Sequence, residues 1–131
     1  MGLSGHCHCG AISYSVAGEP QHSSFCHCED CRRSAGAPVV GWAAFKAADL
    51  AVTGSPASYA SSEHAVRQFC GTCGTGLFYV NEQVLPGLVD IQIATLDDPE
   101  ALPPQLHVQA AERLSWMENI DALPAFDRYP G

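Results

Sequence analysis

The strongest local signal in the sequence is Phe69-Cys70-Gly71-Thr72-Cys73-Gly74-Thr75-Gly76. Two cysteines separated by two residues can bind one ion within a single tight turn. The glycine after the second cysteine permits a positive φ, so that backbone amides can face the sulfurs. This pattern is typical of a zinc knuckle. One knuckle supplies two thiolates, whereas a closed structural zinc site needs four. The segment therefore predicts that a second group of cysteines completes the site.

Five other cysteines are available for that purpose: Cys7, Cys9, Cys26, Cys28 and Cys31. If the pair at 7 and 9 joins the knuckle, four thiolates form a closed site and three remain. A closed set of four and an open set of three is the division expected of one structural and one catalytic zinc. We therefore predict two zinc ions. The first is held by Cys7, Cys9, Cys70 and Cys73, and the second, catalytic one by Cys26, Cys28 and Cys31.

Two other interpretations of the cysteines stay open at this point. One is a single four-cysteine site with three bystander thiols, and the other is a redox dithiol formed by Cys28 and Cys31. A redox C-x-x-C usually belongs to a βαβ fold, which the strand-rich pattern does not predict. The histidines between cysteines, such as His8 and His27, are not expected to be ligands, because alternate side chains of an extended segment face opposite ways.

Length and composition indicate one globular domain over residues 1–131, with 47% hydrophobic and 15% charged residues. The formal net charge is −8, from 6 basic and 14 acidic residues. Such a surface repels phosphate backbones and anionic lipids, so we expect neither nucleic-acid nor membrane partners. No apolar run approaches the roughly 20 residues that cross a bilayer. The odd count of seven cysteines and the lack of an export signal predict a cytoplasmic protein.

Short β-rich runs separated by turn signals predict a mainly β fold with little helix. The expected strands are 12–16, 23–25, 39–45, 66–69, 77–80, 89–93 and 106–109. Helical turns are expected at 29–34 and near 47–50, and a third after residue 98, with Asp98 as cap and Pro99 in the first turn. We expect the aromatic residues of the strands to be core, namely Trp42, Phe45, Phe78 and Tyr79. The segment 114–131 is predicted to be a loop-rich tail pinned by Trp116, Phe126 and Tyr129.

Three ordered motifs resemble one known family across nearly the whole chain. They are Gly5-His-Cys-His-Cys-Gly10-Ala-Ile-Ser-Tyr14, Cys26-His-Cys-Glu-Asp-Cys-Arg-Arg33 and Phe69-Cys-Gly-Thr-Cys-Gly-Thr75. The later segments 89–91, 96–99, 104–108 and 113–116 fit the same pattern. The sequence is similar to the glutathione-dependent formaldehyde-activating enzymes, the family that includes centromere protein V.

The resemblance implies a mainly β, Mss4-like zinc-binding fold of small sheets carrying zinc knuckles. It also implies the same division of the cysteines into a structural and a catalytic zinc site. The family reaction condenses formaldehyde with glutathione, formally a carbon–sulfur lyase in reverse. The expected partners are therefore a small thiol and an aldehyde. The tail at 116–121 departs from the family pattern, so substrate contacts are not carried over to it.

A three-thiolate zinc with one open position suits binding an external thiol as thiolate better than generating hydroxide. Arg32 or Arg33 is a candidate to steady the alkoxide that forms, and Glu29 and Asp30 are candidates to relay a proton. The simpler interpretation is that the two arginines are solvent-exposed surface charges and that Glu29 and Asp30 cap the start of a helix. The alternatives from other classes are a non-enzymatic zinc-binding interaction module and a thiol redox sensor.

Overall fold

A computed structural model describes residues 2–131, which form two β-sheets and little helix. The strands are β1 Leu3–His6, β2 Ser13–Val16, β3 His22–Cys26, β4 Val40–Lys46, β5 Leu50–Thr53, β6 Ala57–Ala60, β7 Ala65–Phe69, β8 Gly76–Asn81, β9 Leu88–Gln92 and β10 His107–Val108. The helices are α1 Glu29–Ala35 and the 3₁₀ turns η1 Ala47–Asp49, η2 Ile93–Thr95, η3 Ala110–Glu112 and η4 Ser115–Ala122. The predicted mainly β fold is confirmed.

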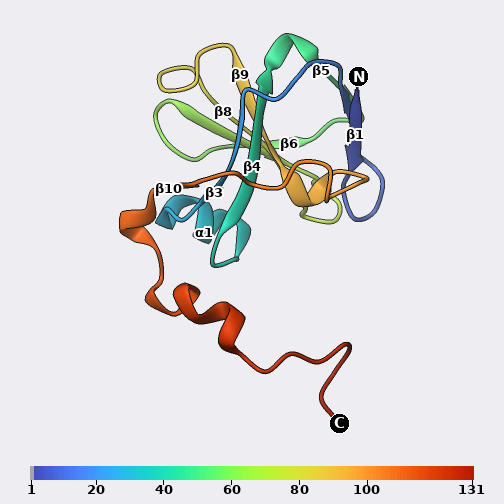
Figure 1. Ribbon diagram of the computed structural model, residues 1–131. Coiled ribbons are helices and arrows are strands. Elements are labelled where there is room, and N and C mark those ends of the chain that lie inside the picture. The colour runs from blue at the N-terminus through green and yellow to red at the C-terminus, as the bar shows by residue number, and fades with distance from the viewer. Residues whose placement is uncertain (1) are drawn as a thin grey trace.

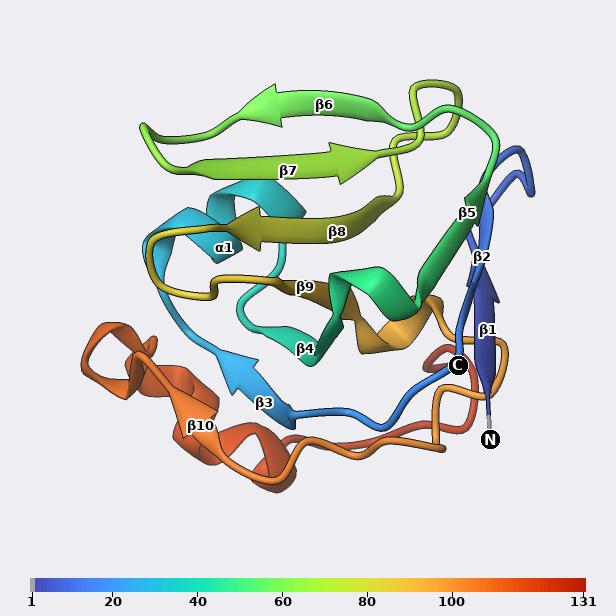
Figure 2. The same cartoon turned by 90° about the horizontal axis from the view of Figure 1, so that it is seen from above.

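The larger sheet has the strand order β10-β3-β4-β9-β8-β7-β6, and the smaller sheet has the order β1-β2-β5. Every pairing between neighbouring strands is antiparallel except that of β10 with β3. The small sheet lies on the side away from α1 and β10 (Figures 1 and 2). This arrangement gives the larger sheet two different environments, one on each face.

One face of the larger sheet packs into the main hydrophobic core with residues of the small sheet. Phe45, Phe78 and Ile91 are almost completely buried there, together with Ile12 and Val16 from the small sheet side. Alternate residues of a strand point to opposite faces. The residues between these therefore point to the other face, which carries most of the polar groups.

A row of directly opposed residues crosses that second face from β3 to β6. Its members are His22, Ala44, Asp90, Tyr79, Arg67 and Tyr59. Opposed residues in antiparallel strands have their side chains on the same face. Because several members of the row are ionisable, this face is the natural place for polar chemistry.

Helix α1 begins directly after the second cysteine motif. Cys28 is the N-cap residue, and its Sγ accepts a hydrogen bond from the N–H of Cys31 at 3.3 Å. Gly36 ends the helix with φ of 64°, and its N–H donates to the carbonyl of Arg32. The helix has one buried residue, Cys31. The predicted helical turns at 29–34 and 47–50 are therefore confirmed, the second as a 3₁₀ turn.

The helix predicted after residue 98 is wrong. The carboxyl of Asp98 does accept the N–H of Glu100 at 3.2 Å, but the chain forms only a turn. Pro103 and Pro104 follow within one turn, and neither has the N–H that a helix needs. Asp98 thus accepts a backbone hydrogen bond as a helix cap would, but the segment before the prolines is too short to form a helix.

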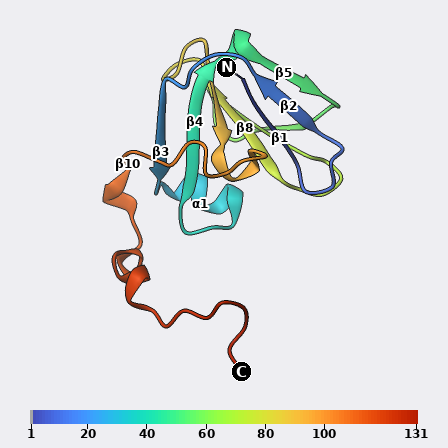
Figure 3. The same ribbon diagram turned by 45° about the vertical axis from the view of Figure 1, so that its right-hand side comes forward.

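The expectation that aromatic residues pin the tail is also wrong. Trp116, Phe126 and Tyr129 are 58%, 57% and 93% exposed. Beyond β10 the tail runs away from the two sheets (Figures 1 and 3). After Val108 no strand pairing ties the described chain to a sheet, so these side chains have little apolar surface to cover them. No helix within residues 2–131 is long and apolar enough to cross a membrane.

Three strands were not predicted: β1, β5 and β6. They are short, and in β5 and β6 most residues are exposed. Periodicity in four residues is too weak to identify a strand whose pairing comes from distant segments. Among the predicted core aromatics, Trp42, Phe45 and Phe78 are buried, whereas Tyr79 is half-buried on the polar face.

Candidate metal centres

Four cysteines from two distant segments converge on one point and form the group called here the cysteine quartet: Cys7, Cys9, Cys70 and Cys73. Their sulfurs all lie within 4.8 Å of one another. The Sγ of Cys9 lies 3.7 Å from those of both Cys7 and Cys70. Bonds of about 2.3 Å to a tetrahedral zinc place sulfurs about 3.8 Å apart. The donor set therefore fits a tetrahedral thiolate-bound ion.

The two halves of the quartet are built alike. The N–H of Ile12 donates to the Sγ of Cys7 at 3.3 Å, and the N–H groups of Thr72 and Cys73 donate to the Sγ of Cys70 at 3.4 Å. The glycine after each pair, Gly10 and Gly74, has φ of 83°. The predicted positive φ after the second cysteine is therefore confirmed. These amides place positive partial charge beside sulfurs that would be ionised in a metal site.

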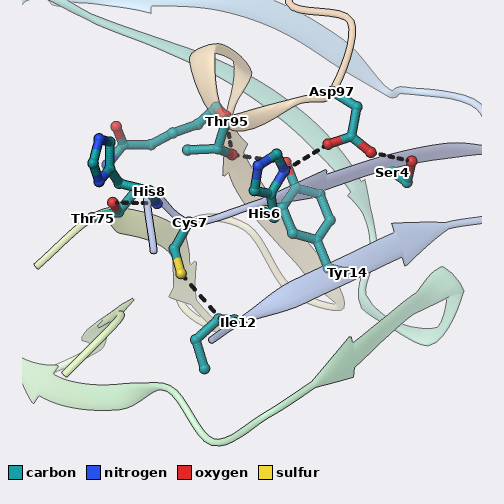
Figure 4. A network of polar contacts seen from close by, with 10 residues as sticks. Ser4, His6, Cys7, His8, Ile12, Tyr14, Thr75, Thr95 and Asp97 are labelled. Carbon is teal, nitrogen blue, oxygen red and sulfur yellow. Dashed lines mark hydrogen bonds and ion pairs between the residues drawn. The ribbon is translucent and has the colours of Figure 1, made fainter. Parts of the chain in front are cut away.

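A polar network ties the first cysteine loop to the turn after β9 (Figure 4). Asp97 accepts from the hydroxyl of Ser4 at 2.6 Å and lies 2.7 Å from Nδ1 of His6. These two contacts hold the pKa of the Asp97 carboxyl below its ordinary value. Beside them, the hydroxyls of Tyr14 and Thr95 lie 2.7 Å apart. Burial raises the pKa of Tyr14 to about 12.

The two cysteine loops also touch each other directly. The N–H of His8 donates to Oγ1 of Thr75 at 3.1 Å (Figure 4). The same oxygen lies 3.2 Å from the Sγ of Cys73. Hydrogen bonds from the side chain and backbone of Thr75 lower the pKa of the Cys73 thiol to about 5. The loop contacts thus favour a thiolate at this position even without an ion.

The other three cysteines form a second group, called here the cysteine trio: Cys26, Cys28 and Cys31. Their sulfurs also lie within 4.8 Å of one another. Cys26 ends β3, Cys28 caps α1 and Cys31 lies in its first turn, so a strand end and a helix start place the three together. The helix start is what lets residues 28 and 31 point to one ion, because residues three apart share a helix face.

Arg67 is the basic side chain closest to the trio, and the sequence analysis missed it. Its Nη2 donates to Oδ2 of Asp30 at 2.6 Å and to the Sγ of Cys31 at 3.6 Å. Its guanidinium lies 4.7 Å from the centre of the Tyr79 ring. Arg67 is only 7% exposed. Hydrogen bonding with Cys26 and with Arg67 lowers the pKa of the Cys31 thiol to about 5.

The only sequence feature that pointed to Arg67 was its position as an arginine within the predicted strand 66–69. Such a residue is most simply interpreted as solvent-facing, because arginine is rarely buried without a partner. The partner Asp30 is 37 residues away in sequence. Only the pairing of β7 beside β8, under α1, brings the two charges together.

A cavity of about 330 Å³ opens beside the trio and is called here the cysteine cavity. Its wall includes all three cysteines, and the polar face of the sheet forms its base with Trp42, Tyr79 and Asp90. A larger cavity of about 750 Å³, the side cavity, lies between α1 and β6 to β8. The two cavities share Asp30, Trp42 and Arg67 in their walls. The ion pair of Asp30 and Arg67 therefore lies where the two cavities adjoin.

The charged residues predicted beside the trio lie in different places. Arg33 is exposed and pairs with Glu29 at 2.7 Å, one helical turn apart. Arg32 donates from Nε to the carbonyl of His27 at 3.2 Å. Neither arginine lines the cysteine cavity, but Asp30 does. The position expected for Arg32 or Arg33 is thus taken by Arg67.

The histidines do not join either cysteine group among the described residues. His27 is buried beneath the trio, with Nε2 at 2.8 Å from Nδ1 of His107. The ring of His107 in turn stacks on Phe25 at 5.8 Å between centroids. His27 therefore faces away from the sulfurs, toward β10.

The sequence model of the glutathione-dependent formaldehyde-activating enzymes matches residues 2–112. A Halomonas elongata protein named for that activity is 30% identical over 132 residues, covering 90% of this chain and 81% of its own. A Schizosaccharomyces pombe protein named as an uncharacterized lyase is 35% identical over 75 residues. That match covers 57% of this chain and 55% of the yeast protein, so the chain matches about half of that relative.

Among solved structures, a Rhodobacter sphaeroides protein superposes with a TM-score of 0.62 and 26% identity. The superposition covers 80% of this chain and 99% of that one. The family match, the shared fold and the two cysteine groups agree with the resemblance seen in the three sequence motifs. The chain belongs to the family of glutathione-dependent formaldehyde-activating enzymes.

Proposed function

We propose that the protein is a zinc-dependent enzyme of the carbon–sulfur lyase type. It adds glutathione, or another small thiol, to formaldehyde or a small aldehyde, and the same site reverses the addition. The observation that carries this proposal is the difference between the two cysteine groups. The quartet has the four sulfurs of a closed site, whereas the trio offers three sulfurs and borders a cavity.

Two zinc ions follow from this interpretation. A structural zinc would be held by Cys7, Cys9, Cys70 and Cys73, and a catalytic zinc by Cys26, Cys28 and Cys31. Zinc suits an all-thiolate tetrahedral set of ligands. We place the protein in the cytoplasm, where a reducing environment keeps seven free cysteines reduced.

The chemistry of the trio is the delivery of a thiol. A zinc ion there would supply an open coordination position at which an external thiol loses its proton and becomes a nucleophile at neutral pH. Trp42 is buried and forms part of the cavity wall beside the sulfurs, which limits the water that competes with the thiol. Arg67 is held by Asp30 and contacts Cys31, so its charge offsets part of the negative charge of three thiolates.

The side cavity is where we place the rest of the thiol molecule. Its volume of about 750 Å³ exceeds what a two-carbon thiol needs, and it leads from Asp30 and Arg67 past Gln68 and Gln92. These groups offer hydrogen bonds of both polarities to a peptide-like or sugar-like body. The net charge of −8 gives an anionic thiol no long-range attraction, so recognition has to come from such contacts.

The first test is zinc stoichiometry by elemental analysis of reduced wild type and of Cys28→Ser. Serine is a preferred N-cap residue, so this variant removes a metal ligand while it preserves the cap of α1. We expect two zinc ions to fall to one, with an unchanged circular dichroism spectrum. One zinc in both proteins would overturn the catalytic-site proposal and favour an interaction module or a redox sensor.

The second test is catalysis of the exchange between ¹³C-formaldehyde and its thiol adduct, followed by exchange NMR spectroscopy. Wild type should accelerate this exchange above the spontaneous rate, and Cys28→Ser should abolish the acceleration. Comparison of glutathione, cysteine and 2-mercaptoethanol then identifies the thiol. A wild-type protein with two zinc ions and no acceleration with any thiol would refute the proposed activity.

A further inference from the structure

The polar face of the larger sheet holds one carboxyl group to which the zinc chemistry above gives no role. Asp90 lies in the middle of β9, in the row that runs from His22 to Tyr59. It is 8% exposed and forms part of the wall of the cysteine cavity. Its Oδ1 is buried and has no hydrogen-bond partner within residues 2–131. A buried carboxyl oxygen without a partner is costly and therefore asks for an explanation.

The neighbours of Asp90 in the row do not neutralise it. Ala44 separates it from His22 on one side, and Tyr79 separates it from Arg67 on the other. Neighbouring strands lie about 4.8 Å apart, so Arg67 is about 10 Å away at the backbone. That arginine is already held by Asp30 at 2.6 Å. Asp90 is thus left facing the cavity, with the guanidinium and Cys31 across from it.

The addition of a thiol to an aldehyde needs a group that moves one proton. The S–H bond breaks and a C–S bond forms, while the electron pair of the carbonyl moves to oxygen. That oxygen then takes one proton, so nothing is oxidised or reduced and no proton is lost overall. The group that serves must accept a proton near the sulfur and return it near the oxygen.

The other ionisable groups at the cavity are less suited to that task. The guanidinium of Arg67 cannot give up its proton. The carboxylate of Asp30 is held in an ion pair with Arg67. The hydroxyl of Tyr79 accepts a hydrogen bond from Nδ2 of Asn81 at 3.1 Å. His22 is half-buried at the far end of the row, with Ala44 between it and Asp90.

We propose that Asp90 carries the proton of the reaction, taking it from the incoming thiol and returning it to the oxygen of the aldehyde. This role rests on the proposed function, since it needs a thiol bound at the trio. Burial raises the pKa of the Asp90 carboxyl to about 6, the charge of His22 opposes the rise, and the negative field of Cys31 adds to it. A carboxyl of that kind is ionised at neutral pH and still basic enough to accept a proton.

The experiment counts protons when 2-mercaptoethanol binds to the zinc-loaded protein at pH 6.5, just above the pKa of the Asp90 carboxyl. Calorimetry in buffers of different ionisation enthalpy gives the number released. Wild type should release clearly less than one proton, because the bound thiolate adds negative charge beside Asp90, raises the pKa of its carboxyl further and leaves part of the thiol proton on it. Asp90→Asn keeps the shape of the side chain but cannot accept it, so this variant should release about one proton per thiol bound.

Rates give a second, independent readout on the same variants. Asp90→Asn should lower kcat about 10²-fold to 10³-fold, with little change in zinc content. Glu63→Gln is the matched control, because Glu63 is an exposed carboxyl, its side chain 88% accessible, and should leave both readouts unchanged. In wild type alone, the ¹³C signal of the Asp90 carboxyl should shift toward the protonated position when the thiol binds at pH 6.5. This last readout does not depend on how well a variant folds.

The outcomes separate the two proposals. Thiol binding with the same proton count in wild type and Asp90→Asn, or an unmoved Asp90 carboxyl signal, overturns the role of Asp90 and leaves the thiol site standing. No thiol binding to wild type that holds two zinc ions overturns the proposed function, and the role of Asp90 with it.

Discussion

Two glycines beside the cysteine quartet provide a matched test of how the knuckle loops are held. Gly74 follows Cys73 with φ of 83°, and Gly54 follows β5 with φ of 96°. A Cβ added at Gly74 would have no heavy atom within 4 Å. A Cβ at Gly54 would lie 2.5 Å from the carbonyl oxygen of Ala11 and 2.9 Å from Cδ1 of Ile12. The two alanine substitutions therefore share backbone strain but differ in steric overlap.

The expected destabilisation follows from these contacts. Positive φ costs a non-glycine residue about 1–2 kcal/mol, so Gly74→Ala should lower the free energy of unfolding by about that amount. Gly54→Ala adds overpacking against backbone, which typically costs about 1–3 kcal/mol more. The total for Gly54→Ala is then about 2–5 kcal/mol. Relief of the overlap must move Ile12, whose N–H donates to the Sγ of Cys7 at 3.3 Å.

Urea unfolding in excess zinc measures the free energies, and transfer of zinc to a chromogenic chelator measures how firmly the quartet holds its ion. Gly54→Ala should be the less stable variant and should release the quartet zinc faster than wild type. If Gly74→Ala is as destabilised as Gly54→Ala, the packing of Gly54 against the first cysteine loop does not have the importance assigned to it. Unchanged zinc release in Gly54→Ala would refute the link between that packing and the metal site.

Further predictions concern the core, the buried tyrosine and the buried ion pair. Phe45→Ala should lower the free energy of unfolding by about 3–5 kcal/mol because Phe45 is fully buried, whereas Tyr129→Ala, at a position 93% exposed, should change it by less than about 0.5 kcal/mol in the same urea titration. Burial raises the pKa of Tyr14 to about 12, so the neutral phenol stabilises the fold below pH 10, and this contribution is lost as the pH rises toward 12. In an absorbance titration at alkaline pH, Tyr14→Phe should remove the late ionisation step that belongs to this tyrosine. Arg67→Met leaves the Asp30 carboxylate without its partner, but this group is 53% accessible and can be hydrated. Asp30→Asn leaves the Arg67 guanidinium, which is only 9% accessible, so it should destabilise the fold more than Arg67→Met. Equal decreases in the melting temperature of the two variants would contradict this ranking.

Local sequence patterns predicted most of the elements that carry the two cysteine groups. The positive φ of the glycine after Cys73, the helical turn at α1 and the alternating strands at β4, β8 and β9 all follow from short-range rules. The division of seven cysteines into four and three also followed from counting and spacing, and the structure brings the same seven sulfurs into the same two groups. Cysteines that can bind one ion can be recognised in a sequence because the short metal–sulfur bonds limit their spacing.

Contacts that depend on strand order were not visible in the sequence. The position of Arg67 beside Cys31 needs β7 to lie two strands from β9 and under α1, and the cavity position of Asp90 needs the same register. A one-residue shift in either strand would turn these side chains to the opposite face. The exposed tail was likewise unforeseeable, since its aromatic residues have the composition of core and lack only a surface to cover them.

Cysteine spacing along the chain identifies the residues that can bind metal, because it limits which sulfurs can reach one ion. The tertiary structure alone decided which charged groups face the trio, because Arg67, Asp90 and Asp30 come from three separate elements. Their meeting is set by long-range pairing of strands whose individual sequences are compatible with either face of a sheet.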